Sequence, residues 1–479
     1  MNPFELHPDR LSTTDETGKR IFLFPADVRG FFRSWRTRVQ FVLILFFLGL
    51  PWVRVDGEQA VLLDITNRKF EFFGLSLRAH NAPLLLFVLA VAGFGLFFAT
   101  AVWGRVWCGW ACPQTVFIDG VFRRIERWIE GSALERRQLA SAPWSARKIL
   151  KRSLKWSAFL SASLVITHSF LAYFVGTENL ARMIKSSPVE NWGSFLFMAV
   201  STSIILFDFA WFREQFCTIV CPYGRFQSVL MDSRSKIVAY NLSRGEPRAT
   251  PQAKAISKTH GTKLGDCVNC YRCVQVCPTG IDIRRGVQME CIACTACIDA
   301  CDEVMAKLKK PTGLIRYDSL AGLQGKTQTS FRLRPVVYLS VVAISALALI
   351  LSLAWMKPVD VAVLRAKESP YTLQTTEAGE VFVLNHFKIE LSNQSGALHQ
   401  IIFELHPEES SLGVSLVTAL KPFPLKDGDL TRADVFARFP KNVLSNGQRK
   451  VRLKVQDQNT QTGQIILIEK EMTLVGPFT

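Results

Sequence analysis

Five apolar runs constrain the fold of this 479-residue chain more than any other feature. A helix needs about 20 residues to cross the hydrocarbon core of a bilayer, where each backbone polar group must find its partner inside the protein. The runs are Val39–Val53, Ala82–Trp103, Trp156–Val175, Trp192–Phe212 and Pro335–Met356. The alternative for each run is a helix buried in a protein core, and this alternative is strongest for the short first run. The runs predict a five-span α-helical membrane bundle.

Basic residues are distributed unevenly between the segments that flank these runs. Lysine and arginine exceed aspartate and glutamate by 17 over the whole chain. Residues 1–38 contain 7 of them, residues 104–155 contain 11 and residues 213–335 contain 19, whereas residues 54–80 contain 4 and residues 176–191 contain 2. Because basic loops stay on the cytoplasmic side, the N-terminus and both long loops are predicted to be cytoplasmic. The positive charge therefore indicates membrane topology, and we expect no nucleic-acid partner.

The segment after the last apolar run has a different character. Residues 357–479 contain 14 basic and 14 acidic residues and no cysteine. Apolar and polar residues alternate along four stretches: Val381–Leu391, Leu398–Leu405, Lys450–Gln456 and Gln464–Leu474. Such alternation is typical of half-buried strands. We therefore expect an all-β, immunoglobulin-like sandwich on the outer side of the membrane.

Eight of the 12 cysteines lie in two copies of the motif C-x2-C-x2-C-x3-C. In bacterial-type ferredoxins such a motif gives three ligands to one [4Fe–4S] cluster, and its fourth cysteine binds the other cluster. The expected ligand sets are Cys267, Cys270, Cys273 and Cys301 for one cluster, and Cys291, Cys294, Cys297 and Cys277 for the other. Zinc sites prefer separate C-x2-C pairs, and disulfides are disfavoured in a cytoplasmic loop. One departure from the motif is Asp302, which stands where a proline follows the first copy.

The other four cysteines form a second repeat, C-x3-C-P, after the second and fourth apolar runs. The two pairs are Cys108 with Cys112 and Cys217 with Cys221. On a helix this spacing places both sulfurs on one face, and the proline should end the helix near the second cysteine. The nearby arginines, expected to favour the thiolate forms, are Arg105, Arg123, Arg213 and Arg225. We interpret the pairs as candidate catalytic thiols for copper or redox chemistry, in one shared site or two; small packing residues are the alternative.

Asp208 is an ionisable residue within the fourth run. It precedes Cys217 by nine residues, or about 13 Å along a helix. Ionisable groups at membrane depth are costly and usually functional, so a proton or cation route to the thiols is one hypothesis. A hydrogen bond to a serine or threonine of a neighbouring helix is the other.

These features together predict a multidomain chain. The expected parts are a cytoplasmic N-terminal segment (1–38), four membrane helices with two C-x3-C-P ends (39–235), a cytoplasmic dicluster ferredoxin loop of α+β type (236–334), a fifth membrane helix (335–356) and a periplasmic immunoglobulin-like domain (357–479). No phosphate-binding loop, dinucleotide fingerprint or Ser/His/Asp arrangement stands out in the sequence.

The order of these features resembles that of the CcoG/FixG/RdxA family of cbb3-type cytochrome c oxidase accessory proteins. The features are two C-x3-C-P ends, the ferredoxin loop, a further span and an outer β-domain. The resemblance covers essentially the whole chain and implies a protein of the bacterial inner membrane that reduces Cu(II) to Cu(I). It also implies a copper-transporting ATPase or copper chaperone and oxidase assembly factors as partners. The sequence identifies neither the electron donor nor the oligomeric state, and a homo-oligomer is one option.

Two other functions remain open at the level of sequence. A quinol–ferredoxin relay to a respiratory reductase would use the same clusters and needs a quinone pocket among the membrane helices. A non-catalytic, redox-sensing assembly scaffold would need the clusters but no copper chemistry. Copper reduction by the purified protein separates the first hypothesis, a cupric reductase, from the scaffold.

Overall fold

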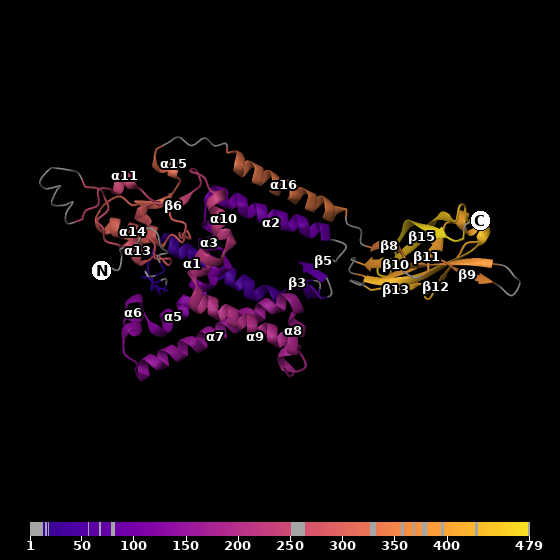
Figure 1. Ribbon diagram of the computed structural model, residues 1–479, viewed down its shortest axis with the longest axis horizontal. Helices are drawn as coiled ribbons and strands as arrows, with labels where there is room; N and C mark the ends of the chain where they lie inside the picture. The colour runs from indigo at the N-terminus through magenta and orange to yellow at the C-terminus, as the bar shows by residue number, and fades with distance from the viewer. Residues whose placement is uncertain are drawn as a thin grey trace. The chain divides into compact units, whose positions relative to one another are not determined.

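The structure is a computed structural model that describes residues 13–14, 17, 19–55, 57–66, 69–77, 82–250, 264–325, 332–355, 359–366, 369–375, 381–393, 397–426 and 430–477. The chain divides into two compact units, Met1–Ile350 and Leu351–Thr479. The first unit is mainly helical and the second is built of strands (Figure 1).

Among the described residues, four helices are long and apolar enough to cross a membrane. They are α2 (Ala82–Trp103), α7 (Ala146–Val175), α9 (Trp192–Phe207) with its π-helical continuation η4 (Asp208–Phe212), and α16 (Leu333–Ala354). They match four of the five predicted spans. Their large apolar side chains stay open to the surroundings, as at Leu86, which is 66% exposed, and Ile344, which is 68% exposed. Surfaces of this kind suit lipid and not water, so the chain is a membrane protein.

The first predicted span lies in α1 (Phe31–Gly49). At its start, the backbone N–H groups of Phe32 and Arg33 donate to the Asp299 carboxylate at 3.2 and 2.7 Å. Near its end, the Phe47 carbonyl accepts a hydrogen bond from the Tyr173 hydroxyl at 2.8 Å. Its 19 residues rise about 28 Å. The helix therefore runs from the cysteine-rich region to the end of α7, although a crossing by α1, and hence the count of five spans, stays a prediction.

The segment after α1 contains short strands that the sequence analysis did not predict. They are β1 (Arg54–Val55), β2 (Glu58–Gln59), β3 (Val61–Asp64), β4 (Lys69–Phe72) and β5 (Leu75–Leu77), after the single turn η1 (Leu50–Trp52). Gln59 holds this segment against the next helical junction. Its side chain donates to the Ala172 carbonyl at 3.1 Å and accepts from the Thr177 N–H at 3.1 Å, where α8 (Thr177–Lys185) begins. The two weakly basic loops therefore lie at the same end of the bundle.

Short helices connect the long ones at the cysteine-rich end. They are α3 (Val106–Trp110), α4 (Pro113–Phe117), η3 (Ile118–Phe122), α5 (Arg123–Glu130), α6 (Ala133–Ser141), η5 (Phe216–Val220) and α10 (Pro222–Leu230). Aromatic packing joins them to the bundle: the Phe122 ring lies 5.0 Å from Phe159 of α7 and 5.3 Å from Phe209 of η4. All three side chains are buried.

The ferredoxin loop forms a small α+β layer around a two-stranded sheet. Strand β6 (Ile237–Tyr240) pairs antiparallel with β7 (Ile315–Asp318), with Ile237 opposite Asp318. The helices of this layer are α11 (Leu242–Gly245), α13 (Arg272–Gln275), η6 (Ile283–Arg285), α14 (Ala296–Lys307) and α15 (Leu320–Leu323). Its core combines Val238 and Ile315 of the sheet with Val274, Ile283 and Ile298.

The described strands of the second unit form two antiparallel sheets. One has the order β12–β14–β10–β8, with β9 also paired to β10, and the other has the order β13–β11–β15–β16. The strands are β8 (Val359–Arg365), β9 (Thr372–Thr375), β10 (Val381–Asn393), β11 (His399–Leu405), β12 (Ser415–Thr418), β13 (Phe423–Leu425), β14 (Leu430–Pro440), β15 (Gln448–Asn459) and β16 (Ile465–Val475), with the helical turns α17 (Pro407–Ser410) and η7 (Lys441–Val443). Alternate residues of β10 and β15 enter one shared core, for example Phe387, Ile389 and Leu453. All four predicted strands are present within three residues of their predicted limits.

Candidate functional site

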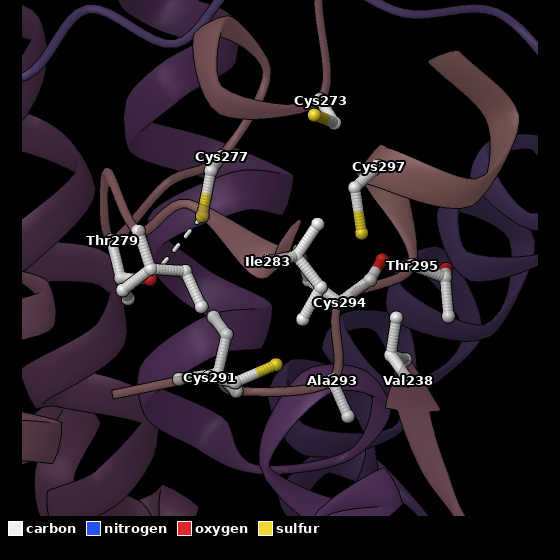
Figure 2. A pocket seen from close by; sticks show the side chains of 12 residues that line it. Val238, Cys273, Cys277, Thr279, Ile283, Cys291, Ala293, Cys294, Thr295 and Cys297 are labelled. Atoms are coloured by element: carbon white, nitrogen blue, oxygen red, sulfur yellow. Dashed lines mark hydrogen bonds between the residues drawn. The ribbon is translucent and has the colours of Figure 1, made fainter. Parts of the chain in front are cut away.

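One cavity of the ferredoxin layer, the second-motif cavity, collects cysteines from both motifs. It has a volume of about 350 Å³ and is lined by Cys277 together with Cys291, Cys294 and Cys297. Figure 2 shows the sulfur atoms of Cys277, Cys291 and Cys297 pointing toward the middle of this cavity. The Cys277 sulfur lies 3.3 Å from the Thr279 hydroxyl. The last cysteine of the first motif therefore faces the first three cysteines of the second.

A neighbouring cavity, the first-motif cavity, has the reciprocal arrangement. Its volume is about 360 Å³, and it is lined by Cys267, Cys270, Cys273 and Cys301. Cys301 belongs to the second motif and projects from α14, four residues after Cys297. Cys273 lines both cavities, so the two sites are adjacent.

The two cysteine loops have the same backbone conformation, although their sequences differ. In each loop the residues before and after the second cysteine have positive φ: 54° and 55° at Asn269 and Tyr271, and 52° and 63° at Ala293 and Thr295. Positive φ is unfavourable for residues other than glycine. The repetition of positive φ at four non-glycine positions indicates that the backbone of each loop curves around a site at its centre.

The donor sets fit [4Fe–4S] clusters. Such a cluster is held by four cysteine thiolates, and each cavity has at least four cysteines, with Cys273 shared, in otherwise largely apolar surroundings. Burial raises the pKa of Cys291 to about 11 and that of Cys301 to about 12. Free thiols here would be protonated near neutral pH, so assembly of a cluster releases protons from them.

The two C-x3-C-P segments also share one backbone plan, which differs from the predicted one. Each long helix ends at a left-handed residue four positions before the first cysteine: Gly104 with φ +57° and Arg213 with φ 50°. The first cysteine of each pair, Cys108 or Cys217, then lies on a separate short helix, α3 or η5, and not on the end of α2 or α9. Cys112 and Cys221 are extended residues with ψ 128° and 112°, and the following proline begins a new helix in each copy.

The first cysteines of the two pairs pack against the second-motif cavity. Cys108 and Cys217 both contact an apolar cluster that contains Val276, Ile292 and Cys294. Gly109 is in close contact with the same loop, because a Cβ atom on it would lie 2.6 Å from the Ile292 and Ala293 carbonyl oxygens. The membrane-proximal thiols and the proposed ligand Cys294 therefore belong to one packed unit.

Comparison with known proteins gives two close relatives over most of the chain. Protein RdxA of Cereibacter sphaeroides is 38% identical and covers 79% of this chain and 80% of its own length. Protein RdxB of the same organism is 36% identical and covers 84% of this chain and 86% of its own length. The chain belongs to the FixG/RdxA family. The nitrogen fixation protein FixG of Rhizobium meliloti is 39% identical, and the match covers 63% of this chain and 58% of FixG.

Three family descriptions match successive parts of this FixG/RdxA chain. Residues 212–320 match a 4Fe-4S dicluster domain, residues 84–131 match a 4Fe-4S binding domain, and residues 349–477 match an IG-like fold at the C-terminus of FixG, putative oxidoreductase. The protein is thus an iron–sulfur electron-transfer protein of the membrane. The immunoglobulin-like character predicted for the C-terminal domain is confirmed. The segment 84–131 contains only Cys108 and Cys112 of the 12 cysteines.

Burial outweighs the nearby arginines, which were expected to favour the thiolate forms of the C-x3-C-P cysteines; the effect of Arg105 on the pKa of Cys108 has the expected direction but is smaller. Burial raises the pKa of Cys108 to about 11 and also raises the pKa of Cys112 and Cys217. The arginines are engaged elsewhere. Arg105 donates to the Cys291 and Gly224 carbonyls at 3.3 and 3.1 Å, and Arg225 donates to the Ile219 carbonyl at 3.2 Å. Arg123 pairs with Asp119 at 2.6 Å, and Arg213 pairs with Glu126 at 2.6 Å.

Asp208 lies in a hydrogen-bond arrangement that leads to the first cysteine pair. The Gln114 side-chain amide donates to the Asp208 carboxylate at 2.9 Å and to the Arg213 carbonyl at 3.1 Å. Gln114 follows Cys112 by two residues, so the amide joins the two C-x3-C-P segments. The partner is a glutamine and not the predicted serine or threonine. A proton route through Asp208 stays a prediction.

Sequence reasoning missed one direct partner of the thiols. The Gln227 side-chain amide donates to the Cys108 sulfur at 3.0 Å. Gln227 is fully buried on α10, one and a half turns after Pro222. A glutamine at that distance from a C-x3-C-P motif gives no recognisable signal in the sequence.

Replacing Gly109 with alanine should destabilise this FixG/RdxA protein and separate α3 from the second-motif loop. The added methyl group meets two backbone carbonyls at 2.6 Å, and overpacking of this kind costs about 1–3 kcal/mol. Thermal unfolding in detergent, with iron content measured on the same sample, checks this. Gly93→Ala in α2 is the matched control, because its Cβ atom meets nothing within 4 Å. Equal melting temperatures for the two variants would contradict the close packing.

Proposed function

We propose that this protein carries electrons through two [4Fe–4S] clusters to copper and reduces Cu(II) to Cu(I) for assembly of a cbb3-type cytochrome c oxidase. The proposed cluster ligands are Cys267, Cys270, Cys273 and Cys301 for one cluster, and Cys291, Cys294, Cys297 and Cys277 for the other. The copper-binding thiols are Cys108, Cys112, Cys217 and Cys221. One electron from a reduced cluster converts one Cu(II) ion to Cu(I).

The packing of Cys108 and Cys217 on the Cys294 loop carries the proposal. Both thiols contact the apolar cluster that contains Cys294. Because Cys294 lines the second-motif cavity, an electron there needs to cross only a short, well-packed stretch of protein. The second-motif cavity is therefore the exit side of the electron path, and the first-motif cavity lies behind it.

The chain's own groups suit a soft cation at the thiol pairs. Thiolates prefer Cu(I) among the common oxidation states of copper. Gln227 donates to the Cys108 sulfur, and a hydrogen bond to a thiolate favours the charged form. Because burial raises the pKa of Cys108 to about 11, binding of copper at neutral pH displaces a proton from this thiol.

The topology is part of the proposal. The basic loops that contain the cysteines are assigned to the cytoplasm and residues 357–479 to the periplasm of a bacterial inner membrane, on the distribution of lysine and arginine. A copper-transporting ATPase or copper chaperone and oxidase assembly factors are the proposed partners, and the donor is a cytoplasmic reductant. Alkaline phosphatase fused after Thr479 should be active, and an inactive fusion would contradict this orientation.

Anaerobic copper reduction tests the proposed function directly. Full-length holoprotein is reduced with dithionite, freed of excess reductant and mixed with Cu(II), and Cu(I) is followed with a Cu(I)-specific chelator. We expect the wild-type protein to yield up to one Cu(I) per stored electron. The Cys108→Ala/Cys217→Ala variant should lose at least about tenfold in rate with its iron content unchanged, because the thiols nearest the second-motif loop are gone.

Thr218→Ala is the matched control for that variant. Thr218 lies between the cysteines of the second pair, and its hydroxyl donates to the Gln215 carbonyl at 3.2 Å, so the change leaves all four thiols in place. It should reduce copper at the wild-type rate. A wild-type protein with both clusters that reduces no copper would favour the quinol relay or the scaffold instead.

A further inference from the structure

A cavity beside the cysteine-rich region is unusually rich in arginine. It has a volume of about 480 Å³ and lies among α1, α5, α6 and the chain before α1. Five arginines line it: Arg33, Arg36, Arg123, Arg127 and Arg136. The acidic residues among its lining are Asp27 and Asp119. We call it the arginine cavity.

The carboxylates fix some of these arginines but do not balance them. Asp119 alone is shared by three: Arg36 and Arg123 contact it directly, and Arg33 lies 3.9 Å from it. Although burial opposes the shift, Arg36, Arg123 and Arg33 together hold the pKa of Asp119 well below its usual value. The lining residues alone have an excess of three positive charges. Glu214, which contacts Arg123 at 2.5 Å, and Glu126, which contacts Arg136 at 3.2 Å, lie outside the lining and reduce this excess.

Two buried donors of the lining arginines are without a partner among the residues that the structure describes. The Nε atoms of Arg123 and Arg136 are buried without a hydrogen-bond partner within the described part of the chain. Arg136 is 4% exposed. A buried donor left unsatisfied costs free energy, and two such donors on arginines that line one cavity favour an anionic occupant. Arg33, with a side chain 22% exposed, stands at the accessible edge.

We propose that the arginine cavity binds the phosphate group of a small molecule. Guanidinium forks match phosphate oxygens in pairs, and a bound phosphate offsets the positive charge that the neighbouring carboxylates leave. Cys294 and Pro278 line the same cavity, so the bound group adds negative charge beside the second-motif cysteines. A soluble phosphate monoester and the headgroup of an anionic phospholipid share this chemistry. The inference does not depend on copper reduction.

Calorimetric titration of the full-length holoprotein tests the site. The protein is placed in phosphatidylcholine nanodiscs and titrated with inorganic phosphate as the probe. We expect one site in the wild type and at least tenfold weaker binding in Arg33→Gln, whose side chain makes a long ion pair to Asp119 at 3.9 Å. Arg38→Gln is the control: Arg38 lies on the same helix, stacks on Trp35 at 5.0 Å and is absent from the cavity lining. It should bind within twofold of the wild type.

A second titration separates the two sources of phosphate. In nanodiscs that contain phosphatidylglycerol, a site filled by the lipid headgroup should bind inorganic phosphate more weakly, whereas a site for a soluble ligand should bind it unchanged. Either result supports the site. No binding in phosphatidylcholine nanodiscs, or an equal loss in Arg33→Gln and Arg38→Gln, would overturn the proposal. Iron content and the EPR signals of the reduced clusters, measured on every variant, show that the fold is intact.

Discussion

The Cys277→Ala variant should lose the cluster of the second-motif cavity, although Cys277 stands in the first motif. Its sulfur points into the cavity lined by Cys291, Cys294 and Cys297 (Figure 2). Iron should fall from about eight to about four atoms per protein. The EPR spectrum of the remaining reduced cluster should match that of Cys291→Ala and differ from that of Cys267→Ala.

The reciprocal variant is the control. Cys301→Ala should lose the cluster of the first-motif cavity, because Cys301 lines that cavity with Cys267, Cys270 and Cys273. With dithionite as reductant, Cys301→Ala should still reduce copper, since Cys108 and Cys217 pack on the Cys294 loop. Cys277→Ala should not. A Cys277→Ala spectrum that matches Cys267→Ala would mean that each motif holds its own cluster.

The sequence carried enough information to predict which cysteines the two cavities bring together, because the chemistry is local. Three cysteines within seven residues can encircle one cluster face only with a particular backbone path, and the positive φ values at Asn269, Tyr271, Ala293 and Thr295 realise this path twice. The exchange of Cys277 and Cys301 follows from the motif. The four long membrane helices were equally predictable, because their apolar length leaves few other structures open to them.

The contacts that join clusters and thiols could not be predicted in this way. Gly109 and the Ile292–Ala293 carbonyls are far apart in the chain, and no periodicity shows that a glycine there is needed for close approach. The breaks at Gly104 and Arg213 were missed for a related reason. The apolar pattern runs almost to the cysteines, and only tertiary contacts decide where each helix stops.

The missed strand β14 shows the limit of alternation as a signal. Its buried positions are Ala433, Val435, Ala437 and Phe439. The two alanines are small and only weakly apolar, so the pattern that revealed β10 and β15 is weaker here. Backbone pairing with both β10 and β12 stabilises β14 as a strand, although its own sequence pattern is weak.

Replacing Glu126 with glutamine should destabilise the protein by about 3–5 kcal/mol, the usual cost of removing one partner from a buried ion pair. Glu126 is 1% exposed and accepts from Arg213 at 2.6 Å and from Arg136 at 3.2 Å. The change leaves these two buried cations without their carboxylate. Because Arg213 forms the left-handed turn before Cys217, the second thiol pair should lose its fixed position as well. Thermal unfolding in detergent measures the loss, and the copper assay measures its consequence.

An exposed pair provides the control for this change. Glu303 contacts Lys307 at 2.6 Å with side chains 40% and 72% exposed, and such pairs contribute about 0–1 kcal/mol. Glu303→Gln should therefore melt close to the wild type. Equal destabilisation of the two variants would mean that the Glu126 carboxylate does not compensate the buried arginines.

The Glu126 carboxylate should also make the stability of the folded protein depend on pH. Although burial opposes the shift, Arg213, Lys155 and Arg136 lower the pKa of Glu126 in the folded protein. A carboxylate with a lowered folded pKa contributes its stability in full above its unfolded value of about 4.3 and loses it as the pH falls through the folded value. The wild type should therefore lose more stability than Glu126→Gln when the pH falls from about 5 to about 3. If both proteins lost the same amount, the acid sensitivity would come from other carboxylates, such as Asp119 among its three arginines.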